Sequence, residues 1–600
     1  MIPFQATSIA VLPFENIGAD ENEYFADGIT EEIINALTKI TGLKVTARTS
    51  SFFYRKKHLD ARIIGNALGV ETLLEGSVRM VKERVRISAQ LVRTDNGFHI
   101  WAENFDRNLA DIFELQDEIS LLIADNLREN FGHLEVGEQL IQGPEISVDQ
   151  YQIYLKAKHY LHKFNTENIK LAIDMLKGVV QQQPDFALAH VNIHYGYNMM
   201  AAGGLMPVKE ALTLGKAYLD KALELDNNLP EAYHSLGWHS LNLDWDFKNA
   251  AKFLRKAIAL RPGYADAHHK LFITHALEGK FELAHKHIET AYQLDPLAPL
   301  NNYFYGYYHY LLEEFEASNR FMEKTFELDP SFMVGYSIYA LSLIKQNRAE
   351  YILQKAETIP NVEGGDVERL IMRALAFSSL GIENGEIDRL NVLLDSVHRE
   401  RICFFLIYIK TNLKDFDAAL DLIDKGVARR EPLMTLLQVD PLLRPLHSHE
   451  RFQKAIKQIF AFSDLQTVEA PEKDCSSLLD DDESKQFLTV LKSHMVENEP
   501  FLRPTISLRD LAVEVDIHPN KLSWLLNEKI GKNFNDFVNA YRLEHFKKIS
   551  LMPENKAITL LGLAYDSGFN SKTVFNTFFK RETRMTPKQW VKTNMRKSIS

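Results

Sequence analysis

The sequence predicts a multidomain protein with an N-terminal α/β domain, a central all-α solenoid of helical repeats and an all-α C-terminal domain. Three observations support this fold class. Strand and helix patterns alternate only in about the first 130 residues, a 34-residue period follows, and the last 116 residues carry helical patterns with an excess of basic side chains. The length of 600 residues allows roughly four domains of about 150 residues each.

The composition indicates a globular protein, because 46% of the residues are hydrophobic and 25% are charged. Only two cysteines occur, Cys403 and Cys475, which excludes a disulfide framework and a cysteine-rich zinc site. The longest apolar run, Ile402–Ile409, has eight residues, whereas a membrane span needs about 20. The N-terminus lacks the basic region and cleavage site of a signal peptide. We therefore expect a soluble, cytoplasmic protein without a membrane partner.

The first part of the chain alternates between strand and helix patterns. Apolar residues at helical spacing predict helices over residues 28–40 and 111–126. The apolar positions of these helices are Ile29, Ile33, Ile34, Leu37 and Ile40 in the first, and Ile112, Leu115, Ile119, Leu122 and Ile123 in the second. Strands are expected at residues 8–14, 43–48, 85–91 and 97–101, the last two joined by the turn 94–97. We predict one compact α/β domain over residues 1–132.

Seven segments of this domain carry a family resemblance: SIAVLPFEN, EYFADGITEEI, RTSSF, LLEGSVR, VRISAQLV, GFHIWAENFDR and DIFELQDEI, in that order. They resemble the TolB-N-like (FlgO-like) domain, which is found beside adenylate cyclase and transcription-regulator modules. The resemblance covers about residues 6–130. It implies no set of catalytic residues.

A 34-residue period begins after about residue 150. It is carried by Pro262, Pro296 and Pro330, by Phe247, Phe281 and Phe315, and by two sets of small residues, Ala250, Ala284 and Ser318 and then Ala257, Ala291 and Thr325. Asn227 and Pro184 hold the earlier proline positions. Small residues where paired helices touch and a proline at the turn are the tetratricopeptide signature. We predict an array over residues 150–458, degenerate after residue 341, whose curved surface binds protein or peptide partners.

Charge is divided unevenly along the chain. Residues 485–600 hold 19 Lys and Arg against 11 Asp and Glu, a net charge of +8, which leaves −20 for residues 1–484. A basic block on an acidic body is typical of a domain that meets a polyanion. The polar, acidic segment before it, residues 459–484, is predicted to be a mobile linker.

The basic block contains a first helix-turn-helix pattern. Ser507 is placed to cap a helix, and Pro519 opens the next one after a short turn at residues 516–518. The residues expected to face inward are Leu508, Leu511, Ala512, Val515, Leu522, Leu525 and Leu526. Those expected to face outward, near the N-terminus of the second helix where a recognition helix contacts base edges, are Asn520, Lys521, Ser523 and Trp524.

A second helix-turn-helix pattern follows an amphipathic helix predicted at residues 535–549. Ala564 is the small residue where its two helices meet, and Gly568 is suited to a left-handed turn. Ser571 is placed to cap the next helix, with Val574, Phe575 and Phe578 inward. The residues of this motif expected to contact DNA are Asn570, Ser571, Lys572, Thr573, Asn576 and Lys580, because amide, ammonium and methyl groups match base edges and phosphates.

Two segments of this block, LAVEVDIHPNKLSWLLNEKIGKNFNDFVNAYR and LAYDSGFNSKTVFNTFFKRETRMTPKQW, resemble the DNA-binding domain of AraC/XylS transcription regulators. The resemblance implies that residues 485–600 place two recognition helices of one polypeptide in successive major grooves on one face of double-stranded DNA. Arg584 stands where the family usually has glycine, and Trp590 replaces the usual tyrosine or phenylalanine.

Enzymatic and metal sites have no support in the sequence. Phosphate-binding, dinucleotide-binding and nucleophile-elbow motifs are not found. The repeats contain His268, His269, His275, His285 and His287, but the period places His268 and His275 at ordinary packing positions. We expect neither a metal, nor a cofactor, nor catalysis.

The sequence thus favours a sequence-specific, AraC-type transcription regulator. Its array and α/β domain would sense a protein, peptide or small ligand, or mediate self-association as a homodimer. The alternative is a tetratricopeptide scaffold or adaptor that assembles protein partners, with DNA binding secondary.

The uneven charge further suggests a mechanism of regulation in which the basic domain, residues 485–600, is either bound to the acidic residues 1–484 or free to bind DNA. Deleting residues 1–484 should then raise the affinity for the same DNA site, as measured by fluorescence anisotropy at several salt concentrations. Unchanged affinity at all salt concentrations would rule this mechanism out.

Overall fold

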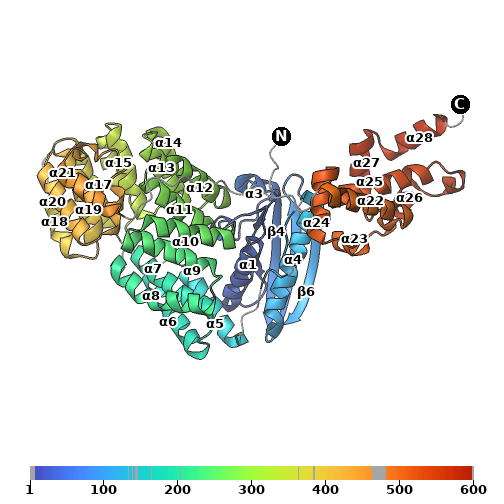
Figure 1. Cartoon of the computed structure of the whole chain (residues 1–600), viewed down its shortest axis with the longest axis horizontal. Coiled ribbons are helices and arrows are strands. Elements are labelled where there is room, and N and C mark those ends of the chain that lie inside the picture. Colours follow the sequence, from blue (N-terminus) through green and yellow to red (C-terminus); the bar gives the residue numbers. More distant parts are fainter. Residues whose placement is uncertain are drawn as a thin grey trace.

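The computed structural model describes residues 7–132, 134–137, 139–141, 146–163, 165–202, 205–362, 364–382, 385–461 and 481–597. The predicted fold class is confirmed: an α/β domain is followed by a long tetratricopeptide-like array and a set of C-terminal helices. The three parts lie in a row in Figure 1, with the N-terminal domain (blue) between the array (green to orange) and the C-terminal helices (red). The first part of the sequence is therefore the centre of the molecule.

The N-terminal domain is built on a mixed sheet in the order β3-β1-β4-β5-β6. Strand β1 pairs in parallel with β3 and β4, and β4, β5 and β6 form an antiparallel meander. The strands are β1 (Thr7–Val11), β2 (Glu15–Asn16), β3 (Leu43–Val45), β4 (Thr72–Val81), β5 (Arg84–Arg93) and β6 (His99–Asn108), and the helices are α1 (Glu23–Leu37), α2 (Arg48–Phe52), α3 (Ala61–Leu68) and α4 (Ile112–Phe131).

The predicted strands and helices of this domain are present, although their ends differ. The apolar stripes of α1 and α4 are buried in one shared core, apart from the partly buried Leu122. Strand β4 was not predicted from its pattern, although it is the central strand that joins the parallel and antiparallel halves of the sheet. Its first residues, Thr72, Leu73 and Leu74, are all buried, because the sheet is covered on both faces there. A strand that is buried on both faces does not alternate apolar with polar residues, so the pattern that predicts a strand is absent here.

The described residues of the array form seventeen α-helices, and their positions confirm that the 34-residue period is a repeat of paired helices. Phe247, Phe281 and Phe315 are the first residues of α10, α12 and α14, and each proline follows the end of one of these helices by two residues. The small residues at both repeated positions are buried where the helices pack together. The helices are α5 (Val148–Leu161), α6 (Thr166–Gln182), α7 (Ala187–Ala202), α8 (Val208–Leu225), α9 (Pro230–His239), α10 (Phe247–Leu260), α11 (Ala265–Leu277), α12 (Phe281–Leu294), α13 (Pro299–Leu311), α14 (Phe315–Leu328), α15 (Met333–Lys345), α16 (Ala349–Ala356), α17 (Gly365–Ser379), α18 (Glu386–Val392), α19 (Arg399–Asn412), α20 (Phe416–Ala428) and α21 (Glu450–Ile459).

The array and the N-terminal domain share polar contacts as well as a core. Lys158 of α5 is buried between Glu31 and Glu32 of α1, at 2.9 and 3.0 Å from their carboxylate oxygens. The repeat turn after α12 also reaches the domain, since Asp295 accepts a hydrogen bond of 2.8 Å from the backbone N–H of Ser50. These contacts hold the two parts together as one body.

The described part of the C-terminal unit, residues 481–597, consists of helices and the turns between them. They are α22 (Asp481–Glu497), α23 (Leu508–Glu514), α24 (Pro519–Trp524), α25 (Phe534–Ile549), α26 (Leu560–Asp566), α27 (Lys572–Thr583) and α28 (Pro587–Lys597). Of the expected linker, residue 459 ends α21, 481–484 begin α22, and 462–480 lie outside the described residues. The inclusion of 481–484 in the linker was wrong: Ser484 is buried in α22 despite the acidic residues around it.

Candidate nucleic-acid interface

The first helix-turn-helix is α23 and α24. Ser507 caps α23 in a capping box, in which its hydroxyl accepts from the backbone of Asp510 and the Asp510 carboxylate accepts from the backbone of Ser507. Pro519 opens α24, as predicted. The inward-facing residues predicted for this motif are all buried in one cluster. The motif therefore has a core of its own, to which α25 contributes Phe534 and Phe537.

The second helix-turn-helix is α26 and α27, and its turn depends on Gly568. The backbone there has φ +90°, and a Cβ on this residue would lie 2.2 Å from the carbonyl oxygen of Phe501. Arg542 of α25 closes the same corner by donating a 2.8 Å hydrogen bond to that carbonyl oxygen. Ala564 is fully buried at the helix crossing, as expected. The Ser571 hydroxyl accepts from the backbone of Val574 and so caps α27.

One inward-facing residue of the second motif was predicted wrongly. Val574 is 41% exposed, whereas Phe575, Phe578 and Phe579 are buried. Residues 575, 578 and 579 define a narrow helical stripe, and residue 574 lies outside it, about 90° around the helix from the centre of the stripe. The first turn of α27 therefore presents an additional apolar side chain to solvent.

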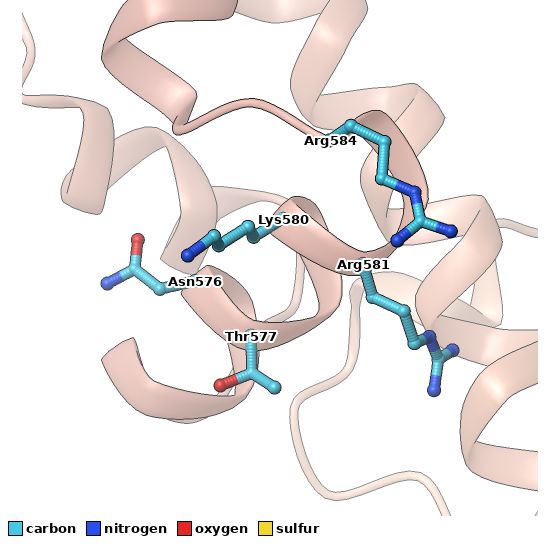
Figure 2. Close-up of a pocket in the computed structure, with 5 residues that line it drawn as sticks. All are labelled: Asn576, Thr577, Lys580, Arg581 and Arg584. Atoms are coloured by element: carbon cyan, nitrogen blue, oxygen red, sulfur yellow. The ribbon is translucent and has the colours of Figure 1, made fainter.

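Helix α27 presents its predicted DNA-contacting side chains to solvent. Lys572, Thr573, Asn576 and Lys580 are all exposed, as is Asn570 in the turn before them. Asn576 and Lys580 line an open hollow of about 460 Å³ together with Thr577, Arg581 and Arg584. Figure 2 shows the side chains of Asn576 and Lys580 extending to the same side of α27. This surface offers an amide and several cations together, which suits base edges and phosphates.

Three of the hollow's residues were not among the predicted contacts: Thr577, Arg581 and Arg584. They follow the first turn of α27 and lie next to the predicted contacts Asn576 and Lys580. The signal for them was the helical spacing 577, 580, 581 and 584, which places them on one face. Arg581 is partly neutralised, because it forms a 2.7 Å ion pair with Asp536 of α25.

Helix α24 is placed differently from α27. Asn520 is turned toward the N-terminal domain, where its carboxamide bonds to Arg128 and Val136. Ser523, predicted to face outward, is buried, and this part of the prediction was wrong: it lies three residues after Asn520, close to the same side of the helix. Trp524 packs partly buried against the core of its own motif. Lys521 is half-buried.

Of the five histidines named above, His268, His269 and His275 are buried in the array, His287 is partly buried and His285 is exposed. The Nδ1 atoms of His268 and His287 are 3.1 Å apart. Burial lowers the pKa of His268 and lowers that of His287 to about 3, so both rings are neutral near pH 7. Within the described part of the chain, no group of three His, Cys, Asp or Glu side chains is arranged to hold a metal ion. Nor does any described helix have the length and apolar character that a bilayer crossing requires.

Two family models match the chain, one at each end. Residues 511–593, from within α23 to within α28, match a helix-turn-helix domain. Residues 5–122 match the second domain of HilA/YgeH-like transcriptional regulators. That match supports a regulator domain in the N-terminal part, while the TolB-N-like resemblance stays a prediction. Together the two matches support a DNA-binding transcription regulator.

Three curated proteins illustrate the similarity. The putative adenylate cyclase 3 of Rhizobium meliloti (strain 1021) is 37% identical over 246 residues, 40% of either chain. The transcriptional regulator HilA of Salmonella typhimurium is 26% identical over 166 residues, 27% of this chain and 30% of HilA. An HTH-type transcriptional regulator of Staphylococcus aureus (strain COL) is 32% identical over 114 residues, 19% of this chain and 14% of that protein. The chain thus spans two fifths or less of the length of these relatives.

The backbone at Arg584 leads to a prediction about stability. This residue ends α27 in the left-handed conformation, with φ +59°, at the position where AraC/XylS proteins usually have glycine. A left-handed non-glycine residue costs about 1–2 kcal/mol. Arg584→Gly should therefore raise the free energy of local opening of α27 by about 1 kcal/mol, measured in the full chain by native-state hydrogen exchange.

The control is Glu582→Gly, two residues earlier in the helical part of α27, which should lower the same free energy by about 1 kcal/mol. A decrease for both variants would show that the conformation of Arg584 carries no strain.

Proposed function

We propose that the chain is a sequence-specific transcription regulator of the AraC type that reads DNA with α24 and α27. The single observation that carries this proposal is the pair of helix-turn-helix motifs joined through α25, whose residues enter the core of both. Two recognition helices held by one shared helix keep a constant separation. That arrangement suits two adjacent major-groove half-sites contacted by one polypeptide.

The side chains of α27 support direct reading of bases. Asn576 is exposed and offers a carboxamide, the group that makes a bidentate pair with adenine. Lys572 and Lys580 are exposed about one helical turn before and one helical turn after it, and their ammonium groups suit guanine or phosphate oxygens. The net charge of +8 over residues 485–600 supports attraction to the DNA backbone.

We also propose that the chain regulates rather than catalyses. The name of the Rhizobium relative refers to a cyclase, but the similarity covers only 40% of that protein. The helix-turn-helix and regulator domains instead support a role at promoters. The array then serves as the surface for a protein or peptide partner, or for a second copy of the chain.

A scaffold that binds partners through the array remains the second candidate function. It is favoured by the size of the array, which runs from α5 to α21, over half of the chain. The two candidate functions differ in whether the exposed face of α27 binds DNA at specific sites.

The test is chromatin pull-down and sequencing with the full-length protein and the double variant Lys572→Ala/Asn576→Ala. A regulator should give discrete peaks that share one motif, and the double variant should lose them. With a DNA duplex that carries this sequence motif, each lost groove contact should weaken binding by about 1–3 kcal/mol.

Lys221→Ala is the matched control, since it removes a lysine of α8 in the array whose side chain is 43% exposed. It should leave the peaks unchanged. Peaks that persist in the double variant, or equal losses in the control, would contradict reading by α27.

A further inference from the structure

The C-terminal end of α4 holds the first helix-turn-helix against the N-terminal domain. The Glu129 carboxylate accepts a 2.7 Å hydrogen bond from the backbone N–H of Leu508, the first residue of α23. Asp125 forms a 2.5 Å ion pair with Arg509. The carbonyl oxygen of Asn130 accepts a 2.8 Å hydrogen bond from the side chain of Asn533, at the start of α25. These contacts come from the last two turns of α4 and reach the start of α23 and the start of α25, the helices before and after α24.

At the centre of this contact lies Asn520, the second residue of α24. Its Oδ1 accepts hydrogen bonds from the Arg128 guanidinium (2.8 Å) and from the backbone N–H of Val136 (3.3 Å). Its Nδ2 donates to the carbonyl oxygen of Val136 at 3.2 Å. Both halves of the carboxamide are therefore used by the N-terminal domain, to which we assign Val136 because it follows α4 and is buried in the same core.

The pairing with Val136 has the hydrogen-bond pattern of a base contact. An asparagine that reads adenine in the major groove accepts from the N6 amino group and donates to N7. The main chain of Val136 presents the same donor and acceptor to Asn520. One carboxamide cannot make both pairs at once.

Arg128 makes the contact specific. Its side chain is 1% exposed, and its second guanidinium nitrogen donates to Asp125 at 2.6 Å. A buried guanidinium needs acceptors, because an unpaired buried charge is costly. Asn520 supplies one of them, so the N-terminal domain is adapted to this side chain of the recognition helix.

We propose that the N-terminal domain is a built-in competitor of DNA, in which Val136 and Arg128 take the place of a base at Asn520 of the first recognition helix. The proposal rests on the proposed function and names the regulation of that same surface. In the docked state α27 is exposed and α24 is covered, so only one of two half-sites is open to DNA. Figure 1 shows this arrangement, with α24 beside α4 and α27 away from the N-terminal domain.

Because of Glu129, the docking of the first helix-turn-helix onto the N-terminal domain should depend on pH. Burial under α23 raises the pKa of Glu129 to about 7, assisted by Asp125 of α4 and Asp510 of α23, and opposed by the Leu508 N–H and by Arg128. In the undocked state the side chain becomes exposed, with a pKa near its ordinary value of 4.5. Docking therefore gains stability when Glu129 is protonated, and loses it as the pH rises through about 7.

The main experiment compares two charge reversals on α4 in the full chain. Glu129→Arg places a cation at the positive N-terminal end of α23, beside Arg128 and Arg509, and should release the domain. The affinity for a two-half-site DNA should rise about tenfold, as expected for the loss of one buried polar contact. Glu114→Arg is the matched control: it makes the same charge change at an exposed position in the first turn of α4, and should change the affinity less than twofold.

Hydrogen exchange in the wild-type chain tests the proposal without a variant. The Val136 amide, protected by Asn520 in the free protein, should exchange faster once the protein is saturated with the two-half-site DNA. Two results would overturn the proposal: continued protection of the Val136 amide in that complex, or a Glu129→Arg variant that loses this protection but binds DNA no more tightly than Glu114→Arg.

The pH dependence is tested with Glu129→Gln, which keeps an acceptor for Leu508 and removes the charge. Wild type should bind DNA several-fold more tightly at pH 8 than at pH 6, relative to the variant, because only wild type loses docking as Glu129 ionises. Parallel pH curves for the two proteins would contradict a role of Glu129 in docking.

These measurements separate the inference from the proposed function. If wild type, Glu129→Arg and Glu114→Arg all fail to select any DNA motif at low salt, the proposed function is wrong. If wild type selects a motif and the two reversals behave alike while Val136 stays protected in the complex, the function stands and the competition is wrong.

Discussion

The arrangement of the three parts depends on the packing of α4. Its apolar stripe is buried with α1 and the sheet in one core, and that core continues into the first helices of the array. Its last two turns carry the C-terminal unit through the polar side chains of Asp125, Arg128 and Glu129. Because both contacts belong to one rigid helix, the position of the DNA-binding unit is set by the core of the N-terminal domain. A change in that core would be transmitted along the helix to the surface of α24.

The DNA-binding unit is held together by α25 in a similar way. Neither helix-turn-helix has more than a small cluster of its own, and α25 supplies aromatic and aliphatic side chains to both, including Phe537 to the first and Phe546 to the second. Arg542 binds the backbone near Phe501, against which the turn at Gly568 packs. The two motifs consequently move as one unit. Covering α24 therefore also restricts how α27 can approach DNA.

The array lies on the side of the N-terminal domain opposite to the DNA-binding unit (Figure 1). It meets the domain through its repeat turns and through the buried Lys158. A partner bound to the array is thus separated from α24 by the sheet and α4. The N-terminal domain therefore has two interfaces, one with the array and one with the DNA-binding unit. A structural change in the array would reach the DNA-binding unit through this domain.

The sequence by itself determined the features that depend on near neighbours in the chain. The 34-residue period predicted the helices of the array and the prolines that follow them. Helix ends are built from residues three or four positions apart, so the sequence also predicted the caps at Ser507 and Ser571 and the turn at Gly568. Only the tertiary structure decided what Asn520 and Ser523 face, since the Arg128–Asn520 hydrogen bond joins residues 392 positions apart. Polar residues on a recognition helix look the same whether they meet DNA or a domain that imitates its hydrogen bonds. The buried start of β4 escaped prediction for a related reason: cover from both sides removes the local pattern that marks a strand.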